Sequence, residues 1–317
     1  MGNNTRHVGK ALRMTVKKGT KQIRRWLIYV IVCLIVKLLR AIPRRFAIAI
    51  MRGIGRAAYL LIGSRRKRMI NHLTMAFGNE KSLSEIKRIS KEVFLNIGIF
   101  AADAIRLPQI VGNGMEDIVT VEGCDRLDQV LANGKPAILL TAHLGNWELM
   151  AAWFAQKGYK VKVIGAPNHN PWIDRLIVQT RNEAGYTSIT RKTNTREILD
   201  GIRNGYSMGI LIDQDTKVEG VFVKFFNQWA HTAVGPVVLA RKYGLSIIPI
   251  FIRLNGQFTY HIEVQEPIDL NFTDNKDHDL VINTQKISDI YERIIRRFPE
   301  QWVWMHRRWK KQPQAVN

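Results

Sequence analysis

Cysteine is scarce in this sequence, with two residues among 317. Cys33 lies inside an apolar run and Cys124 in a polar stretch, which excludes a disulfide framework and favours a reducing compartment. No Cys/His cluster has the spacing of a zinc site. Proline is also sparse, with 10 residues, while 46% of all residues are hydrophobic. A mostly disordered chain is therefore excluded, and a folded protein with a sizeable core is expected.

Acidic residues are absent from the first 79 positions, and the first one is Glu80. Before it stand 18 of the 48 Lys and Arg residues, which leaves 30 basic against 26 acidic residues in the rest of the chain. The net charge of +22 thus belongs mainly to an N-terminal arm. Such an arm attracts nucleic acid or anionic lipid headgroups.

The sequence also lacks an apolar run of the roughly 20 residues that span a bilayer. Its longest run, Trp26 to Val36, continues past Lys37 through Leu39 and has arginines on both sides. A nucleic-acid tail has no use for this run, so we expect anionic membrane lipids as partners and no nucleic acid. An interfacial or shallowly inserted helix is favoured, and a short spanning helix remains the alternative.

We expect residues 1–63 to form a basic N-terminal arm with membrane-anchoring helices, and residues 64–317 to form a catalytic domain. Pro43 should end the first helix. Phe46 to Ile62 has the pattern of an amphipathic helix with Arg52 and Arg56 on one stripe, suited to an anionic membrane. The alternative is a helix that packs on the domain while its arginines face water.

Beyond this arm, short apolar strands alternate with amphipathic helices. Ser82 and Glu85 form a capping box at the start of a helix that reaches about Ala104. The expected strands are 118–121, 137–142, 160–164, 208–212, 246–254 and 258–264, and the expected helices are 124–132, 148–156, 171–184, 195–203, 233–243 and one around Ile287 to Phe298. Asn255-Gly256 predicts a two-residue hairpin turn between the last two strands. The fold class is α/β, with a mixed, mostly parallel sheet flanked by helices.

His143 and Glu148, in the segment His143-Leu-Gly-Asn-Trp-Glu148, are the candidate catalytic residues. On one continuous helix they would lie about 140° apart. A strand end, a turn at Gly145-Asn146 and a new helix capped by Asn146 would instead bring them together. Glu148 would then accept a hydrogen bond from one imidazole nitrogen, while the other removes a proton from a substrate hydroxyl that attacks an acyl thioester. Backbone N–H groups at the helix start would bind the oxyanion.

Two other interpretations of this pair stay open at this point. A His and a Glu five positions apart often occur together by chance. A metal site would need a third ligand such as His169 or Asp213, and the spacing matches no standard zinc motif. We expect neither a metal ion nor a cofactor.

Several motifs, in order along the chain, resemble those of the late acyltransferases of lipid A biosynthesis, the lauroyl and myristoyl transferases. His143 and Glu148 match the His-x4-Asp/Glu motif that these enzymes share with glycerolipid acyltransferases. The other matching segments are Asn71-His-Leu-Thr-Met-Ala-Phe77, Thr141 to Glu148, Asn170-Pro-Trp-Ile-Asp-Arg175, Asp213-Gln-Asp215, Phe225-Phe226, Thr232 to Ala240 and Pro299 to Trp309.

This resemblance implies a glycerolipid-acyltransferase-like fold, an acyl-carrier-protein thioester as donor and a hydroxyl of a lipid A precursor as acceptor. It implies a bacterial inner-membrane location, with the catalytic domain on the cytoplasmic face. Asp213 matches the family's acid after a core strand, and we assign Asp213, Arg175 and Asn146 to substrate binding. The alternatives are an acyltransferase for another glycolipid or aminolipid, and a non-enzymatic membrane adaptor.

One departure from the family concerns position 166, where the family commonly has arginine before proline and this chain has Ala166-Pro167. An arginine there would suit a phosphate or a carboxylate. Arg175, Arg181 and Arg191 lie nearby in the sequence and are possible substitutes or surface charges. Near the C-terminus, Trp302 is expected to pack in the domain, and Arg307 and Arg308 are expected to face a lipid interface.

Overall fold

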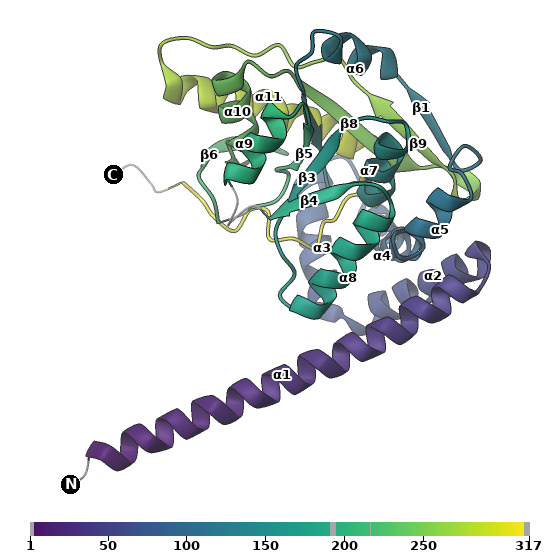
Figure 1. The fold of residues 1–317 in the computed structure, drawn as a ribbon, viewed down its shortest axis with the longest axis vertical. Coiled ribbons are helices and arrows are strands. Elements are labelled where there is room, and N and C mark those ends of the chain that lie inside the picture. Colours follow the sequence, from purple (N-terminus) through teal and green to yellow (C-terminus); the bar gives the residue numbers. More distant parts are fainter. Residues whose placement is uncertain (1–2, 191–194, 216, 314–317) are drawn as a thin grey trace.

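The computed structural model describes residues 3–190, 195–215 and 217–313. Its centre is a seven-stranded sheet in the order β1-β9-β8-β2-β5-β3-β4, in which β8 and β9 are antiparallel and all other neighbours are parallel (Figure 1). The strands are β1 (Val119–Glu122), β2 (Ile138–Thr141), β3 (Val161–Gly165), β4 (Thr187–Thr190), β5 (Ser207–Leu211), β8 (Ile247–Leu254) and β9 (Tyr260–Val264). This is the predicted α/β class with a mixed, mostly parallel sheet.

Helices cover both faces of the sheet. All four residues of β2 are buried, and alternate side chains point to opposite faces: Ile138 and Leu140 to one, Leu139 to the other. On one face, Leu139 packs in an apolar cluster with α5 (Leu107–Gly112), α6 (Cys124–Leu131) and α7 (Trp147–Gln156). On the other face, Ile138 and Leu140 pack in a cluster with α3 (Gly63–Phe77), α4 (Leu83–Ile105), α9 (Thr195–Arg203), α10 (Gly235–Tyr243) and α11 (Lys276–Arg297). Burial on both faces explains why β2 is a continuous apolar run.

Three strands lie outside the predicted set. β4 is short, and only Ile189 in it is buried, so its pattern is weak. β6 (Gly220–Phe225) and β7 (Gln228–Ala233) form a separate antiparallel hairpin. Their turn uses Phe226 and Asn227 at positive φ, without the glycine that normally marks such a turn in a sequence. The hairpin between β8 and β9 is antiparallel as predicted, but the two-residue turn is wrong, because Leu254 pairs with Tyr260 and a 3₁₀ turn over Gly256–Phe258 lies between them.

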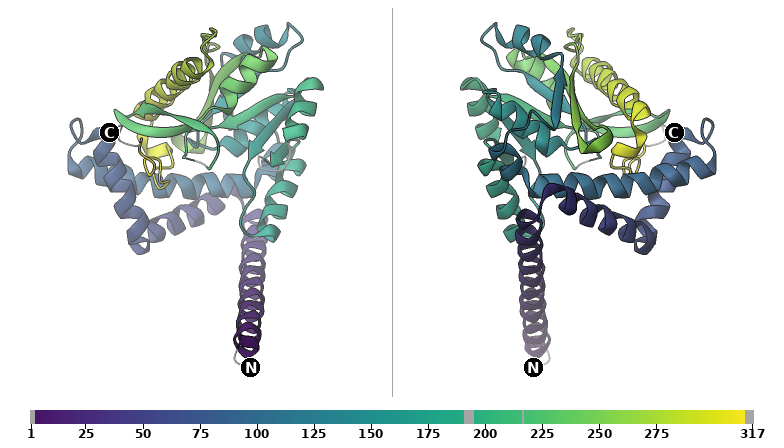
Figure 2. Two further views of the ribbon diagram at one scale, coloured as in Figure 1. Left: turned by 90° about the vertical axis from the view of Figure 1, so that its left-hand side faces the viewer. Right: turned by 90° about the vertical axis from the view of Figure 1, so that its right-hand side faces the viewer.

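The N-terminal part begins with one long helix, α1 (Asn3–Ala41), whose first half extends away from the rest of the molecule (Figures 1 and 2). Its second half reaches α8 (Pro171–Glu183), where Asn170 Nδ2 donates to the carbonyl of Arg25 at 2.9 Å. Pro43 separates α1 from α2 (Arg44–Leu61), as predicted. Large apolar side chains along α1, such as Ile31 and Leu34, are exposed.

Helix α2 packs closely on α4 along one face. A Cβ atom at Gly55 would lie 2.4 Å from the Phe94 carbonyl oxygen, and one at Gly98 would lie 2.3 Å from that of Met51, so glycine is required at both crossings. Arg52 and Arg56 face solvent. The packing interpretation is therefore correct for one face of α2. Phe46, Ile50 and Ile54 elsewhere on this helix remain exposed.

Among the described residues, no single helix combines the length and hydropathy needed to cross a bilayer; α2 and α3 reach that criterion only when taken together, with an 87° bend between them.

The C-terminal segment packs into the domain. Trp302 and Trp304 are buried, as expected for Trp302. The expectation for Arg308 is wrong, because its side chain is buried and donates to the carbonyl of His231 and the hydroxyl of Thr232. Burial lowers the pKa of Arg308 to about 10. Arg307, in contrast, is exposed.

Candidate active site

The pairing of β2 with β5 brings His143 next to Asp213. Thr141 and Leu211 are opposite each other at the carboxyl ends of these parallel strands, and each strand is followed two residues later by one member of the pair. His143 Nδ1 lies 2.8 Å from Asp213 Oδ1, and the backbone N–H of His143 donates to Oδ2 at 2.9 Å. A backbone and a side-chain bond to the same carboxylate fix the orientation of the imidazole ring.

Asp213 is fully buried and remains ionised. Burial alone would raise the pKa of its carboxyl, but His143 and the indole N–H of Trp302, which donates to Oδ2 at 2.7 Å, outweigh this effect and lower the pKa. An ionised carboxylate only accepts hydrogen bonds, so Nδ1 of His143 carries the proton. The opposite nitrogen, Nε2, is thereby left without a proton.

Glu148 does not bond to His143, which corrects the hydrogen bond expected from the motif. Its Oε2 and Oε1 accept from Arg181 Nε at 2.8 Å and Nη2 at 2.6 Å, and the hydroxyl of Tyr186 also donates to Oε2. Burial opposes ionisation of Glu148, but Arg181 and Tyr186 overcome it and lower the pKa of the carboxyl. Glu148 and His143 nevertheless line the same cavity, so both predicted residues belong to one site.

The ion pair between Glu148 and Arg181 should be essential for stability. Its two side chains are 20% and 22% exposed, so Arg181→Met leaves a largely buried carboxylate without its cation and should lower the free energy of unfolding by about 3 kcal/mol. Urea titration of Arg181→Met, Glu148→Gln and the double variant measures this. The double variant should be more stable than Arg181→Met alone; simple additivity of the two losses would contradict the pairing.

The lowered pKa of Glu148 predicts a specific acid sensitivity. A carboxyl whose pKa is lower in the folded state contributes stability above its unfolded value, here 4.5, and loses it as pH falls through the folded value. The difference in melting temperature between the wild type and Glu148→Gln should therefore shrink below pH 4.5. Glu219→Gln, at an exposed position, is the control. A difference that stays constant down to pH 3 would contradict the assignment.

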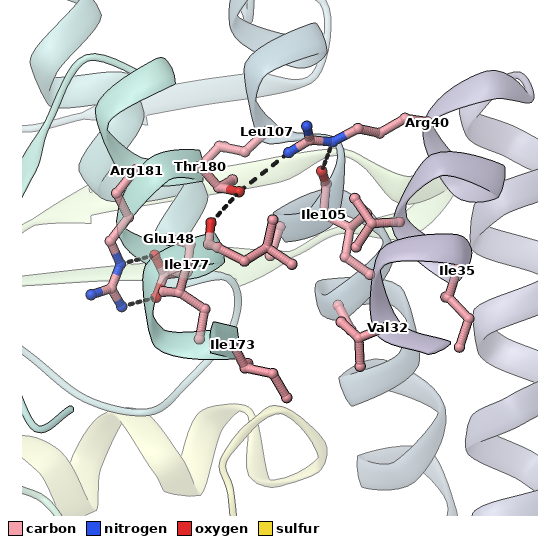
Figure 3. A pocket seen from close by; sticks show the side chains of 14 residues that line it. Val32, Ile35, Arg40, Ile105, Leu107, Glu148, Ile173, Ile177, Thr180 and Arg181 are labelled. Atoms are coloured by element: carbon pink, nitrogen blue, oxygen red, sulfur yellow. Dashed lines mark hydrogen bonds and ion pairs between the residues drawn. The ribbon is translucent and has the colours of Figure 1, made fainter. Parts of the chain in front are cut away.

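Three cavities meet at Glu148. The first, of about 330 Å³, contains His143, Trp147 and Tyr186, and we call it the catalytic cavity. The second, of about 400 Å³, lies between α1, α4 and α8 and is lined mainly by aliphatic side chains, among them Val32, Ile35, Ile105, Leu107, Ile173 and Ile177 (Figure 3). The third, of about 500 Å³, lies between α3, α4 and the segment 303–306. The cavity that contains His143 thus lies beside two largely apolar cavities.

The turn between β2 and α7 shapes this site. Gly145 has φ +63°, and a Cβ atom there would lie 1.9 Å from the carbonyl oxygen of Ile252, so only glycine fits. Asn146 caps α7 as predicted, with its Oδ1 accepting from the Leu149 N–H at 3.2 Å. Its Nδ2 donates to the carbonyl of Phe100 at 3.3 Å, so the oxygen and the nitrogen of the Asn146 side chain both form hydrogen bonds within the protein.

A sequence profile of the family described as bacterial lipid A biosynthesis acyltransferase matches residues 13–311. The chain belongs to this family. The match includes every segment of the site described above, and it agrees with the resemblance noted in the motifs.

Individual relatives are distant. The chain is 24% identical over 193 residues to the phosphatidylinositol mannoside acyltransferase of Mycobacterium tuberculosis, a match that covers 60% of this chain and 59% of that protein. It is 25% identical over 272 residues to the lipid A biosynthesis lauroyltransferase of Escherichia coli, covering 83% and 85%. The 1-acyl-sn-glycerophosphate acyltransferase of Thermotoga maritima, a solved structure, aligns over 77% of this chain and 98% of its own, with 14% identity and a TM-score of 0.35.

The other expected site residues of this lipid A acyltransferase family member lie in different places. Arg175 is exposed on α8 and lines none of the three cavities, whereas Arg181, the next possible substitute, lines two of them. Arg191 lies outside the described residues. Ala166 lines the catalytic cavity. His169 is exposed, and no three His, Cys, Asp or Glu side chains in the described part of the chain are grouped so as to hold a metal ion.

Two side chains of the site were missed by sequence reasoning. Trp302 was expected only to pack, yet its N–H binds Asp213, 89 residues away in the chain. Tyr186 precedes a weak strand and carries no motif. Neither has a local signal, because each meets its partner only through contacts between segments far apart in the chain.

Proposed function

We propose that this protein is an O-acyltransferase that moves a fatty acyl chain from an acyl-carrier-protein thioester to a hydroxyl of a lipid A precursor. The observation that carries the proposal is the hydrogen-bonded pair of His143 and Asp213 on a cavity with two largely apolar cavities beside it. Acyl transfer between lipids needs a base and room for two hydrocarbon groups. Membership of the lipid A biosynthesis acyltransferase family supports this choice of reaction.

In the proposed reaction, Nε2 of His143 takes the proton of the acceptor hydroxyl as its oxygen attacks the thioester carbonyl. Asp213 stabilises the imidazolium that forms. The tetrahedral intermediate then collapses, the C–S bond breaks, and the imidazolium returns the proton to the departing thiol. An ester and a free thiol result, with no covalent enzyme intermediate and no change in oxidation state.

We further propose a location at the cytoplasmic face of the bacterial inner membrane. The support is the charge of the first 79 residues, which contain 18 Lys and Arg and no acidic residue. Exposed apolar side chains on α1 and α2 accompany these cations, a combination that favours binding to an anionic membrane surface. Cosedimentation with vesicles of neutral or anionic lipid, with and without residues 1–63, tests the location.

A second acceptor, a phosphatidylinositol mannoside, is favoured by two observations. The mycobacterial relative carries that substrate in its name, and Ala166 departs from the pattern of the lipid A enzymes. Incubating the purified protein with acyl-carrier-protein donors of several chain lengths and either acceptor separates the two. A mass increase of one acyl chain on the lipid A precursor supports the first proposal, and its absence, with acylation of the mannoside instead, contradicts it.

A further inference from the structure

The cavity of about 500 Å³ has a largely apolar interior and a cationic edge. Ile97, Phe100 and Val303 line it, and so do Met305, His306 and Arg65 of α3, whose side chain is exposed. His306 has a buried Nδ1 without a hydrogen-bond partner in the described part of the chain. An apolar space bounded by polar groups matches an amphiphilic ligand.

Arg65 differs from the other arginines of the three cavities. Arg181 is paired with Glu148, and Arg40 donates to the carbonyl of Ile105 at 2.8 Å (Figure 3). Arg40 also lies 3.7 Å from Glu183. The side chain of Arg65 makes no ion pair with any carboxylate of the described residues. Of the three arginines that line these cavities, Arg65 is therefore the one available to bind an anionic ligand.

Two further arginines lie beside Arg65. Arg68 is one helical turn further along α3 and donates to the carbonyl of Met305 at 3.3 Å, and Arg307 is exposed two residues after Met305. Partial burial lowers the pKa of Arg68, and the nearby charges of Arg307 and Arg65 lower it further. Neither Arg68 nor Arg307 has a carboxylate partner among the residues that the structure describes. Like charges held together without counter-ions repel each other, and a bound anion would relieve that repulsion.

We propose that Arg65, Arg68 and Arg307, here called the rim cluster, bind a phosphate group of the lipid acceptor while its hydrocarbon chains enter the adjoining cavity. This inference rests on the proposed function. Lipid A precursors and phosphatidylinositol mannosides both carry phosphate, so the rim cluster would serve either acceptor. It would also do the work of the arginine that the family commonly has at the position of Ala166.

The surroundings of the rim cluster favour a lipid over an acidic protein. Leu60, Leu61 and Ile62 directly precede α3 and are exposed, with Leu61 at 83%. An exposed apolar segment beside cations suits the boundary between headgroups and hydrocarbon chains. The surface of an acidic carrier protein would leave these side chains in water.

The test compares Arg65→Gln, Arg307→Gln and the double variant with the wild type in neutral detergent micelles, so that no anionic bulk lipid takes part. The acceptor is a phosphorylated lipid A precursor or its enzymatically dephosphorylated form. Each single variant should raise KM for the phosphorylated acceptor roughly tenfold with little change in kcat. KM for the dephosphorylated acceptor and for the acyl-carrier-protein donor should stay unchanged. Arg65→Lys, which keeps the charge, should recover most of the loss.

Arg52→Gln and Arg56→Gln are the matched controls, because both arginines are exposed on the neighbouring α2 and line none of the three cavities. Their KM values should equal that of the wild type. Unchanged KM in the rim-cluster variants, an equal rise with the dephosphorylated acceptor, or a rise confined to the carrier-protein donor would each overturn the inference. If the wild type itself transfers no acyl chain to either acceptor, the proposed function fails instead, and the two failures are distinguishable.

Discussion

Replacing His143 with alanine is expected to reduce kcat by about 10³-fold in protein that still folds. The imidazole is 28% exposed and lines the catalytic cavity, so its loss removes the proposed general base without removing a large part of the core. Transfer of a radiolabelled acyl chain from acyl-carrier protein to the acceptor measures the effect. Single-turnover assays with saturating acceptor would assign the loss to the chemical step.

The molecule contains a matched control for this experiment. His231 Nδ1 lies 3.1 Å from Asp215 Oδ1, so it forms a second histidine–carboxylate pair, but His231 lines none of the three cavities around Glu148. In folded protein, His231→Ala should keep kcat within about threefold of the wild type, less than 1 kcal/mol in the barrier. Full activity of His143→Ala would instead contradict catalysis by His143.

Replacing Asp213 with asparagine should also reduce kcat by about 10³-fold, because the side chain that fixes the tautomer of His143 and stabilises its imidazolium is lost. The acyl-carrier-protein assay again measures the change. Glu148→Gln is the comparison that decides between the two carboxylates. Glu148 bonds to Arg181 and Tyr186, so its loss should reduce kcat at least tenfold less than the loss of Asp213.

The opposite order would overturn the assignment of Asp213. If Glu148→Gln abolished turnover while Asp213→Asn remained active, the carboxylate within the His-x4-Glu motif would be the partner of the histidine during catalysis.

Local features of the fold could be predicted from the sequence because their causes lie within a few residues. The capping box of Ser82 and Glu85, the break at Pro43 and the cap at Asn146 all depend on hydrogen bonds or backbone restrictions between near neighbours. The hairpin of β6 and β7 was not predicted because its turn has Phe226 at positive φ and no glycine beside Asn227, so the usual sequence pattern of such a turn is missing.

The same distinction between local and long-range causes applies to the residues of the active site. The sequence by itself placed His143 after a buried strand, with Gly145 and Asn146 turning the chain into α7, and the ordered motifs indicated the family. Only the tertiary structure decided which carboxylate His143 meets. Asp213 lies 70 residues further along the chain, and it arrives because β5 is the parallel neighbour of β2. Periodicity and capping encode strands and helix ends, but the order of strands in a sheet depends on how all the apolar faces are buried at once, so no local pattern reveals it.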